Sequence, residues 1–200
     1  MTTLILARHG ETDWNSERRW QGHADTPLNE TGRAQSRELA SRLAGRGIVA
    51  IYSSDLARAR ETAELVGAEL GLEVRLDPRL REVDVGEWSG LTSAEVERDY
   101  PDGHRRRREG GTGWSQGESF ESMGARVLEA LRSIASSHPD SCVLAVTHGG
   151  PLRAARAACG DEHSGWTSAG NCDADEFAVE GDRMRWLDST RGGLHQQVQG

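Results

Sequence analysis

The sequence predicts an α/β protein in which helices cover a largely parallel β-sheet. Three short, nearly continuous apolar runs lie at residues 4–7, 48–52 and 142–146, and strands that are buried on both faces have this composition. The segments that follow these runs carry apolar residues at helical spacing. Strands that alternate with helices in this way are typical of a parallel sheet. A chain of 200 residues fits a single domain with a substantial core.

The first half of the chain supplies three predicted strands. The first of them ends in Arg8-His9-Gly10, and a polar loop with two tryptophans follows it. Asn29 is a helix-start residue, and Gly71 is a suitable terminator for a second helix. We expect, in order, strand 4–7, loop 13–28, a helix from 30 to about 45–47, strand 48–52, helix 56–70 and strand 73–76.

The second half of the chain contains the clearest strand signal of that half, a nearly continuous apolar run at 142–146, and it also contains a predicted hairpin. Residues 101–118, rich in glycine and arginine, are expected to be a mobile surface segment. Its four consecutive arginines are expected on a solvated face, with a site for an anion or a partner as the alternative. The remaining expectations are a loop with a short extended piece at 80–90, helices at 92–99, from 119 and at 151–158, a hairpin at 176–188 and a frayed tail at 190–200.

Composition excludes several classes of function. The chain has no lysine, so its 24 cationic side chains are all arginine. P-loop enzymes, Schiff-base enzymes and kinases all require a lysine and are therefore excluded. The net charge of -8 disfavours nucleic acid as a partner. The three scattered cysteines form neither a metal site nor a disulfide framework. Since no apolar run approaches the length of a membrane span, we expect a cytoplasmic protein.

Two histidines share one sequence context, because His9 and His148 each follow a predicted strand and precede a glycine. The ligand crevice of an α/β sheet lies at the carboxyl ends of its strands. If these two strands are neighbours, both imidazoles enter the same crevice, and the helix after strand 48–52 adds Arg58 or Arg60. Together with Arg8, these groups form a site for dense negative charge, for which phosphate is the commonest ligand.

Two imidazoles with nearby arginines are chemically able to bind a metal, to bind a phosphate or to carry out a general-base reaction. A metal is disfavoured, because adjacent guanidinium groups repel a cation and the usual ligand spacings are missing. A phosphate uses every group: one neutral imidazole attacks phosphorus, while the cations disfavour its protonation and neutralise charge on the phosphoryl oxygens. The proton for the leaving alcohol must then come from a carboxylic acid.

Five stretches of the chain form a highly specific set by their order and spacing. They are Leu-Ala-Arg-His-Gly-Glu-Thr-Asp-Trp-Asn at 6–15, Asp-Thr-Pro-Leu-Asn-Glu-Thr-Gly-Arg at 25–33, Ser-Ser-Asp-Leu-Ala-Arg-Ala-Arg-Glu-Thr-Ala at 53–63, Leu-Arg-Glu with Gly-Glu-Trp-Ser-Gly at 80–90, and Thr-His-Gly-Gly at 147–150. This set resembles the histidine phosphatase superfamily, the phosphoglycerate-mutase-like proteins. The resemblance implies a three-layer α/β/α sandwich with a mostly parallel central sheet. It also implies one histidine phosphatase domain over 1–200, with a surface insertion or lid at 91–118.

The resemblance also implies a role for each matching residue. His9 would be the nucleophile that becomes phosphohistidine, and Glu82 would donate a proton to the leaving group and later accept one from the hydrolytic water. Considered without the resemblance, Glu82 is a surface carboxylate paired with Arg79 or Arg81. The other catalytic and substrate-binding positions implied are Arg8, Asn15, Gln21, Gly22, Arg58, His148 and Gly149.

Phosphatases and mutases of this superfamily share one site. The cofactor-dependent mutases resemble one another in an Arg-His-Tyr-Gly run after the acid, whereas Val-Asp-Val-Gly-Glu-Trp follows Glu82 here. We therefore expect a metal-independent histidine acid phosphatase-type phosphomonoesterase, a hydrolase of the phosphatase branch, with a phosphoglycerate-mutase-type phosphotransferase as the alternative. We expect no cofactor, a small phosphorylated metabolite as the ligand, and no nucleic-acid or membrane partner, and a homodimer stays open. Specificity is expected from 21–25, 101–118 and 162–172.

Two further classes of function compete with this expectation. Gly-Trp-Ser-Gln-Gly at 113–117 matches the nucleophile elbow of α/β-hydrolases. That motif needs a buried strand directly before it, and 105–111 has no such composition. A non-catalytic scaffold is disfavoured, because it has no physical need for a complete cationic cluster.

Overall fold

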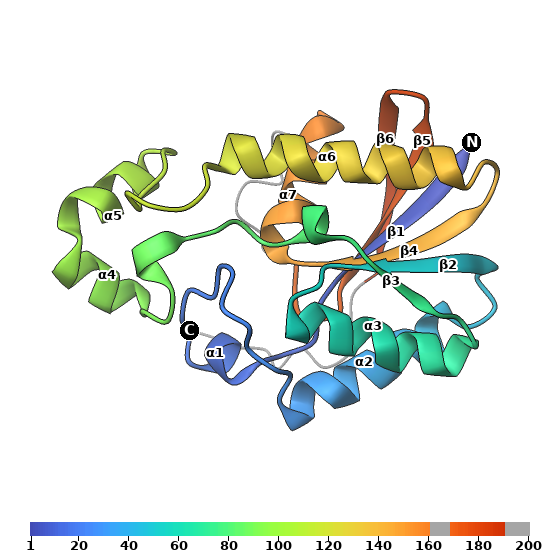
Figure 1. Ribbon diagram of the computed structural model, residues 1–200, viewed down its shortest axis with the longest axis horizontal. Coiled ribbons are helices and arrows are strands. Elements are labelled where there is room, and N and C mark those ends of the chain that lie inside the picture. The colour runs from blue at the N-terminus through green and yellow to red at the C-terminus, as the bar shows by residue number, and fades with distance from the viewer. Residues whose placement is uncertain (161–168, 191–200) are drawn as a thin grey trace.

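The computed structural model describes residues 1–160 and 169–190, and these form a six-stranded sheet with helices on both faces (Figure 1). The strand order is β3-β2-β4-β1-β5-β6. Strands β3, β2, β4 and β1 pair in parallel in this order, while β5 is antiparallel to both of its neighbours, β1 and β6. The strands are β1 Thr2–Arg8, β2 Ile48–Ser53, β3 Val74–Leu76, β4 Cys142–Thr147, β5 Ala174–Glu180 and β6 Arg183–Thr190.

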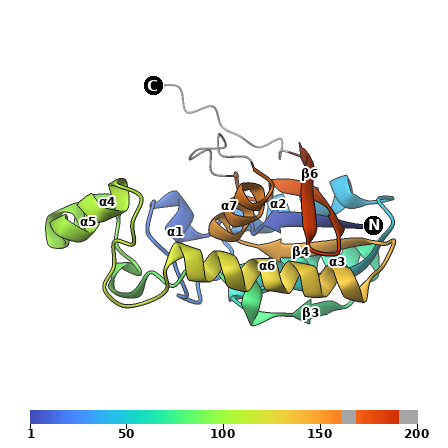
Figure 2. The same cartoon turned by 90° about the horizontal axis from the view of Figure 1, so that it is seen from above.

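The helices pack in two layers, one on each face of the sheet. They are α1 Asp13–Ser16, α2 Glu30–Leu43, α3 Ala57–Leu70, α4 Ser93–Asp99, α5 Pro101–Arg108, α6 Phe120–Ser137 and α7 Gly149–Ala158. Side chains alternate between the faces along β1: Leu4 and Leu6 pack with residues of α6 and α7, while Ile5 and Ala7 pack with those of α2 and α3. Both views show these layers, with α4 and α5 beyond one end of the sheet (Figures 1 and 2). The predicted three-layer α/β/α architecture is confirmed.

The polar loop after β1 contains a short helix that the sequence analysis did not predict. Thr12 and Asn15 close a reciprocal cap, in which the Asn15 N–H donates to the Thr12 hydroxyl (3.2 Å) and the Thr12 N–H donates to Asn15 Oδ1 (3.1 Å). A helix of four residues is too short to show apolar periodicity. The loop expected at 80–90 is confirmed: Arg81 has extended backbone, and the chain forms 3-10 turns at Pro78–Leu80 and Gly86–Trp88 that the sequence did not predict.

The glycine- and arginine-rich segment 101–118 contains a helix and packed side chains that its composition does not indicate. Its first half is α5, and Trp114 is 4% exposed. The Trp114 ring packs edge-on against Trp88, with ring centroids 5.4 Å apart. Three of the four arginines are exposed as expected, but Arg107 is buried, so a solvated face is the wrong interpretation for this residue. A single tryptophan among glycines gives no periodic signal that would reveal such packing.

Part of the chain lies outside the described residues, namely 161–168 and 191–200. The first of these ranges holds most of the 162–172 stretch expected to set specificity. The second holds the tail expected at 190–200 except Thr190, which is the last residue of β6. Among the residues that are described, no helix combines the length and the apolar character needed to cross a membrane.

Candidate active site

His9 and His148 lie side by side because β1 and β4 are neighbours in the sheet. The two strands pair in parallel up to Arg8 opposite Thr147, so each histidine is the residue that follows its strand. The His9 N–H donates to the Thr147 carbonyl at 3.0 Å, and the two imidazole centroids are 5.1 Å apart. His9 is 3% exposed and His148 is fully buried. The prediction that both imidazoles meet at one end of the sheet is confirmed.

Arg58, and not Arg60, enters this group of side chains. Its Nε donates to His9 Nε2 at 3.3 Å. Its terminal nitrogens donate to the carbonyls of Ala24 (2.7 Å) and Gly22 (2.8 Å), so the guanidinium is fixed in place. Arg60 is exposed. Residues two apart on a helix point about 200° away from each other, so only one of the two arginines of α3 is able to face the crevice.

The hydrogen bonds of His9 select one neutral form of its ring. Nδ1 lies 2.7 Å from the Gly10 carbonyl oxygen, and because a carbonyl only accepts, Nδ1 carries the proton. Nε2 then holds a lone pair. Burial, followed by the positive charges of Arg58 and Arg8, lowers the pKa of His9 well below its ordinary value. The ring is thereby kept unprotonated at Nε2, which is the state that a nucleophile requires.

His148 is held by Ser54, a residue whose role the sequence analysis missed. Its Nε2 lies 2.9 Å from the Ser54 hydroxyl, while its buried Nδ1 has no hydrogen-bond partner. Burial, followed by the charge of Arg58, lowers the pKa of His148 as well. Ser54 directly follows β2, the next strand along from β4. The strand-end rule that found the two histidines applies equally to this serine.

Glu82 reaches the same region from the loop between the two 3-10 turns. Its Oε1 accepts the Val83 N–H at 2.9 Å, and its Oε2 accepts the Gly150 N–H at 3.1 Å. A Cβ atom on Gly150 would lie only 2.1 Å from Oε1. A side chain at this position would displace the Glu82 carboxylate from where it now lies.

The alternative placement of Glu82, as a surface carboxylate paired with Arg79 or Arg81, is wrong. The Arg79 side chain binds Asp77 at 2.7 Å, and the Arg81 side chain binds Asp55 at 2.5 Å. Both neighbouring cations are thus paired elsewhere. The Glu82 carboxylate is left directed into the site.

The backbone that carries Glu82 is held from two other parts of the chain. Arg126 of α6 donates to the carbonyls of Arg79 (2.7 Å) and Arg81 (3.2 Å), and its charge is balanced by Glu118 at 2.6 Å. His23 Nε2 lies 2.8 Å from the Glu82 carbonyl oxygen. These contacts fix a loop that has no regular hydrogen-bonding pattern of its own. Neither residue was predicted to hold this loop, because no local sequence pattern links Arg126 or His23 to Glu82.

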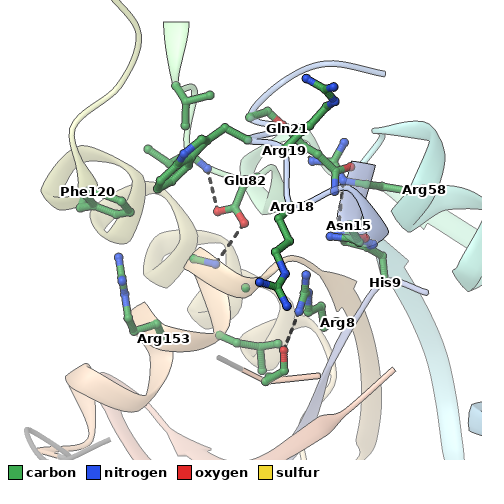
Figure 3. Close-up of a pocket in the computed structure, with 18 of the residues that line it drawn as sticks. Arg8, His9, Asn15, Arg18, Arg19, Gln21, Arg58, Glu82, Phe120 and Arg153 are labelled. Atoms are coloured by element: carbon green, nitrogen blue, oxygen red, sulfur yellow. Dashed lines mark hydrogen bonds between the residues drawn. The ribbon is translucent and has the colours of Figure 1, made fainter. Parts of the chain in front are cut away.

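A cavity of about 360 Å³ opens beside these groups (Figure 3). Arg8 donates to the Ala169 carbonyl at 2.7 Å, and its Nε is buried without a hydrogen-bond partner. Asn171, before β5, donates to the His9 carbonyl (3.0 Å) and to Asn15 (3.3 Å), which joins two sides of the cavity. The fully buried His148 does not line the cavity. The predicted site residues that do line it are Arg8, His9, Asn15, Gln21, Gly22, Arg58, Glu82 and Gly149.

The Gly-Trp-Ser-Gln-Gly stretch at 113–117 is not a nucleophile elbow. It follows helix α5 and no strand precedes it directly. Ser115 is exposed, and its hydroxyl donates to the Glu87 carboxylate at 2.9 Å. An elbow needs its serine at a sharp turn from a buried strand into a helix. Esterase chemistry at this serine is therefore excluded.

A metal centre has no evident ligand set in the described part of the chain. Within 1–160 and 169–190, no group of three or more His, Cys, Asp or Glu side chains is arranged to hold a metal ion. The expectation that no metal or other cofactor takes part stays a prediction.

Because the imidazoles of His9 and His148 are buried, we expect the free energy of unfolding to fall in mild acid. The pKa of both is lowered by burial, from an ordinary value of 6.5. Below that pH the unfolded chain binds protons that the folded chain excludes, so the free energy of unfolding falls by about 1.4 kcal/mol per pH unit for each histidine. Urea denaturation at several pH values between 5 and 7 measures this slope. The His148→Gln variant should decline less steeply, and equal slopes in the two proteins would contradict the prediction.

Comparison with known proteins places this geometry in a family. The family model of the histidine phosphatase superfamily (branch 1) matches residues 4–188. Glucosyl-3-phosphoglycerate phosphatase of Mycobacterium tuberculosis is 41% identical over 165 residues, which cover 78% of this chain and 74% of that protein. The probable phosphoglycerate mutase GpmB of Cronobacter sakazakii is 42% identical over 154 residues, which cover 74% of this chain and 70% of that protein.

A solved structure agrees with these matches. The mycobacterial glucosyl-3-phosphoglycerate phosphatase in complex with VO3 superimposes with a TM-score of 0.82 and 34% identity, over 96% of this chain and 99% of that chain. The family match includes both strand ends that carry the histidines, as well as Arg58 and Glu82. This chain therefore belongs to the histidine phosphatase superfamily, branch 1.

Proposed function

We propose that this chain is a metal-independent phosphatase that hydrolyses a small phosphorylated metabolite through a phosphohistidine on His9. One observation carries the proposal: a neutral His9 Nε2 lies beside Arg58, in a cavity that also holds Arg8 and the Glu82 carboxylate. A nucleophile, cations for the phosphoryl oxygens and an acid are the parts that this reaction requires. Figure 3 shows Glu82 facing the region where His9, Arg8 and Arg58 gather.

In the first step, His9 Nε2 attacks phosphorus, and the P–O bond to the leaving alcohol breaks as the N–P bond forms. Glu82 gives its proton to the departing oxygen. Arg8 and Arg58 neutralise the charge on the non-bridging oxygens. Arg8 lines the cavity and its buried Nε lacks a partner, so Arg8 Nε is the donor that we assign to these oxygens. His148 Nδ1 also lacks a partner, but this side chain is fully buried behind the cavity-lining residues.

In the second step, Glu82 is a carboxylate and accepts a proton from a water molecule, whose oxygen attacks phosphorus. The N–P bond breaks, its electron pair returns to His9 Nε2, and inorganic phosphate leaves. The Gly10 carbonyl holds the Nδ1 proton in both steps, so the ring returns to its starting form.

A phosphotransferase of the mutase type is the second candidate, favoured by the similarity to the probable phosphoglycerate mutase GpmB. A mutase passes the phosphoryl group from the histidine to a second hydroxyl instead of to water. The run Val83-Asp84-Val85 after the acid differs from the Arg-His-Tyr-Gly run of the cofactor-dependent mutases. This difference and the similarity to a phosphatase of M. tuberculosis support hydrolysis.

A rapid-quench experiment with a phosphorus-labelled phosphomonoester tests the proposal. We expect an acid-labile, base-stable label on His9, followed by release of inorganic phosphate at a rate that EDTA does not change. A label on serine, or a rate that falls on chelation, would contradict the mechanism. Transfer of the label to added phosphoglycerate, without release to water, would instead establish the mutase.

A further inference from the structure

The carbonyl that holds the Nδ1 proton of His9 belongs to a peptide group that is itself held from the other side. The Gly10 carbonyl oxygen lies 2.7 Å from His9 Nδ1. The N–H of the same peptide group, which is that of Glu11, donates to Oε1 of Gln35 in α2 at 2.9 Å. Because this peptide group is trans, its C=O and its N–H point in opposite directions. His9 and Gln35 therefore bind the two ends of one rigid dipole.

Helix α2 comes close to this turn because Gly32 has no side chain. A Cβ atom on Gly32 would lie 2.1 Å from the Glu11 carbonyl oxygen and 2.7 Å from the Glu11 nitrogen. Gly32 and Gln35 are three residues apart, so they share one face of the helix. Gln35 is half-buried, and its side chain accepts the Glu11 N–H from this face. Close packing of α2 on the turn therefore brings the amide oxygen within reach.

The preceding peptide group of the same turn is held from α3. The Gly10 N–H donates to the Thr62 hydroxyl at 3.0 Å, and that hydroxyl donates to the Arg58 carbonyl at 2.8 Å. The Gly10 residue is thus fixed by α3 on one side and by α2 on the other. Only the peptide group held by α2 carries the carbonyl that meets His9.

The Gly10 carbonyl favours positive charge on the His9 ring. Burial, followed by the charges of Arg58 and Arg8, lowers the pKa of this ring, whereas the hydrogen bond to the carbonyl acts in the opposite direction. Attack by Nε2 on phosphorus makes the ring cationic, because Nδ1 keeps its proton. A hydrogen bond from a cationic ring is stronger than one from a neutral ring. A peptide group whose N–H is hydrogen-bonded is more polarised, so its carbonyl is the better acceptor.

We propose that Gln35 is a positioning residue for the reaction of His9: it aims and polarises the Gly10–Glu11 peptide group, which stabilises the ring as positive charge develops on it. This inference rests on the proposed function. Gln35 does not line the cavity, so we assign it no contact with the substrate. The stabilisation grows as the N–P bond forms. It should therefore speed the chemical step and leave binding of the phosphoryl group unchanged.

Gln35→Met tests the proposal, because methionine has a similar length and no oxygen acceptor. In single-turnover rapid-quench kinetics with p-nitrophenyl phosphate, the maximal rate of His9 phosphorylation should fall by about tenfold or more, the lower end of the effect of partners that orient a functional histidine. The substrate concentration at half-maximal rate, and the calorimetric Kd of inorganic phosphate, should change by less than about threefold. Gln35→Glu keeps an oxygen acceptor and should react within about threefold of wild type.

The Nδ1 proton of His9 gives a readout that a merely structural role does not move. In proton–nitrogen NMR spectra its resonance, assigned by its loss in His9→Ala, should move upfield in Gln35→Met, because the hydrogen bond to the Gly10 carbonyl weakens. It should keep the wild-type position in Gln35→Glu. A rate that falls while the resonance stays in place would overturn the proposal, as would a resonance that moves while the rate is unchanged.

Two controls separate this role from a loss of stability. Arg37→Met places the same side chain at an exposed position of α2 and should leave the rate and the resonance unchanged. Asn29→Ala removes the cap of α2 and a contact with the Glu11 carboxylate (2.9 Å), but not the bond to the Glu11 N–H. It should lower the urea midpoint and change the rate by less than about threefold. Equal losses of rate in Asn29→Ala and Gln35→Met would contradict the proposal.

Failure of the proposed function gives a different result from failure of this inference. If His9 is labelled but the Gln35→Met variant reacts at the wild-type rate, only the role of Gln35 is wrong. If no phosphomonoester labels His9, the NMR measurement still tests the contact: an upfield shift in Gln35→Met supports the positioning of the ring, and an unchanged resonance overturns it. Gln35→Asn, whose amide is one methylene shorter, replaces Gln35→Met in these experiments if the latter does not fold.

Discussion

Replacing His9 with alanine should lower kcat/KM for p-nitrophenyl phosphate by about 10⁴-fold or more, because the nucleophile of the proposed mechanism is removed. The cations that bind the phosphoryl group remain, since Arg58 is also held by the carbonyls of Ala24 and Gly22. Binding of inorganic phosphate should therefore stay within about tenfold of wild type. Steady-state kinetics and calorimetric titration with phosphate measure the two quantities.

The control for this variant is His138→Ala. His138 is hydrogen-bonded to the Tyr52 hydroxyl at 3.0 Å and does not line the cavity, so its loss should leave kcat/KM unchanged. Circular dichroism of both variants checks that the fold persists. An alanine variant of His9 with more than about a tenth of wild-type activity is incompatible with a phosphohistidine intermediate.

The second large effect is expected from Glu82→Gln, and its size should depend on the leaving group. Alkyl phosphates need a proton on the departing oxygen, so their kcat/KM should fall by about 10² to 10⁴-fold. Because p-nitrophenolate leaves without protonation, its ester should lose less than about tenfold. The glutamine keeps one acceptor oxygen, so it retains one of the two hydrogen bonds from the Val83 and Gly150 N–H groups, and circular dichroism of the variant checks that the fold persists. A substrate series of graded leaving-group acidity measures the dependence.

Glu129→Gln is the matched control, because Glu129 is an exposed carboxylate of α6 that contacts Arg79 at 3.4 Å. This variant should behave as wild type with every leaving group. Equal losses for alkyl and p-nitrophenyl esters in Glu82→Gln would mean that Glu82 does not act as the general acid and has a purely structural role.

Sequence alone determined the parts of this protein that depend on local pattern. Strands that are buried on both faces need continuous apolar runs, and the carboxyl ends of neighbouring parallel strands meet at one edge of the sheet. These two facts predicted that His9 and His148 meet if their strands are neighbours, and the pairing of β1 with β4 in the structure met that condition. The motifs around them identified the superfamily, and the resemblance placed Glu82 in the site where composition alone favoured the surface.

Only the tertiary structure decided the rest, because the deciding partners are far apart in the sequence. The phase of α3 selected Arg58 over Arg60. Ser54 orients His148 from the end of the neighbouring strand, and Arg126 holds the loop of Glu82 from α6. In the sequence Arg107 cannot be distinguished from its three neighbouring arginines, and only the structure shows that it is buried against the ring of Phe120. A run of four arginines specifies charge, but which of them is turned inward depends on packing between α5, α6 and α7, and no local pattern encodes that packing.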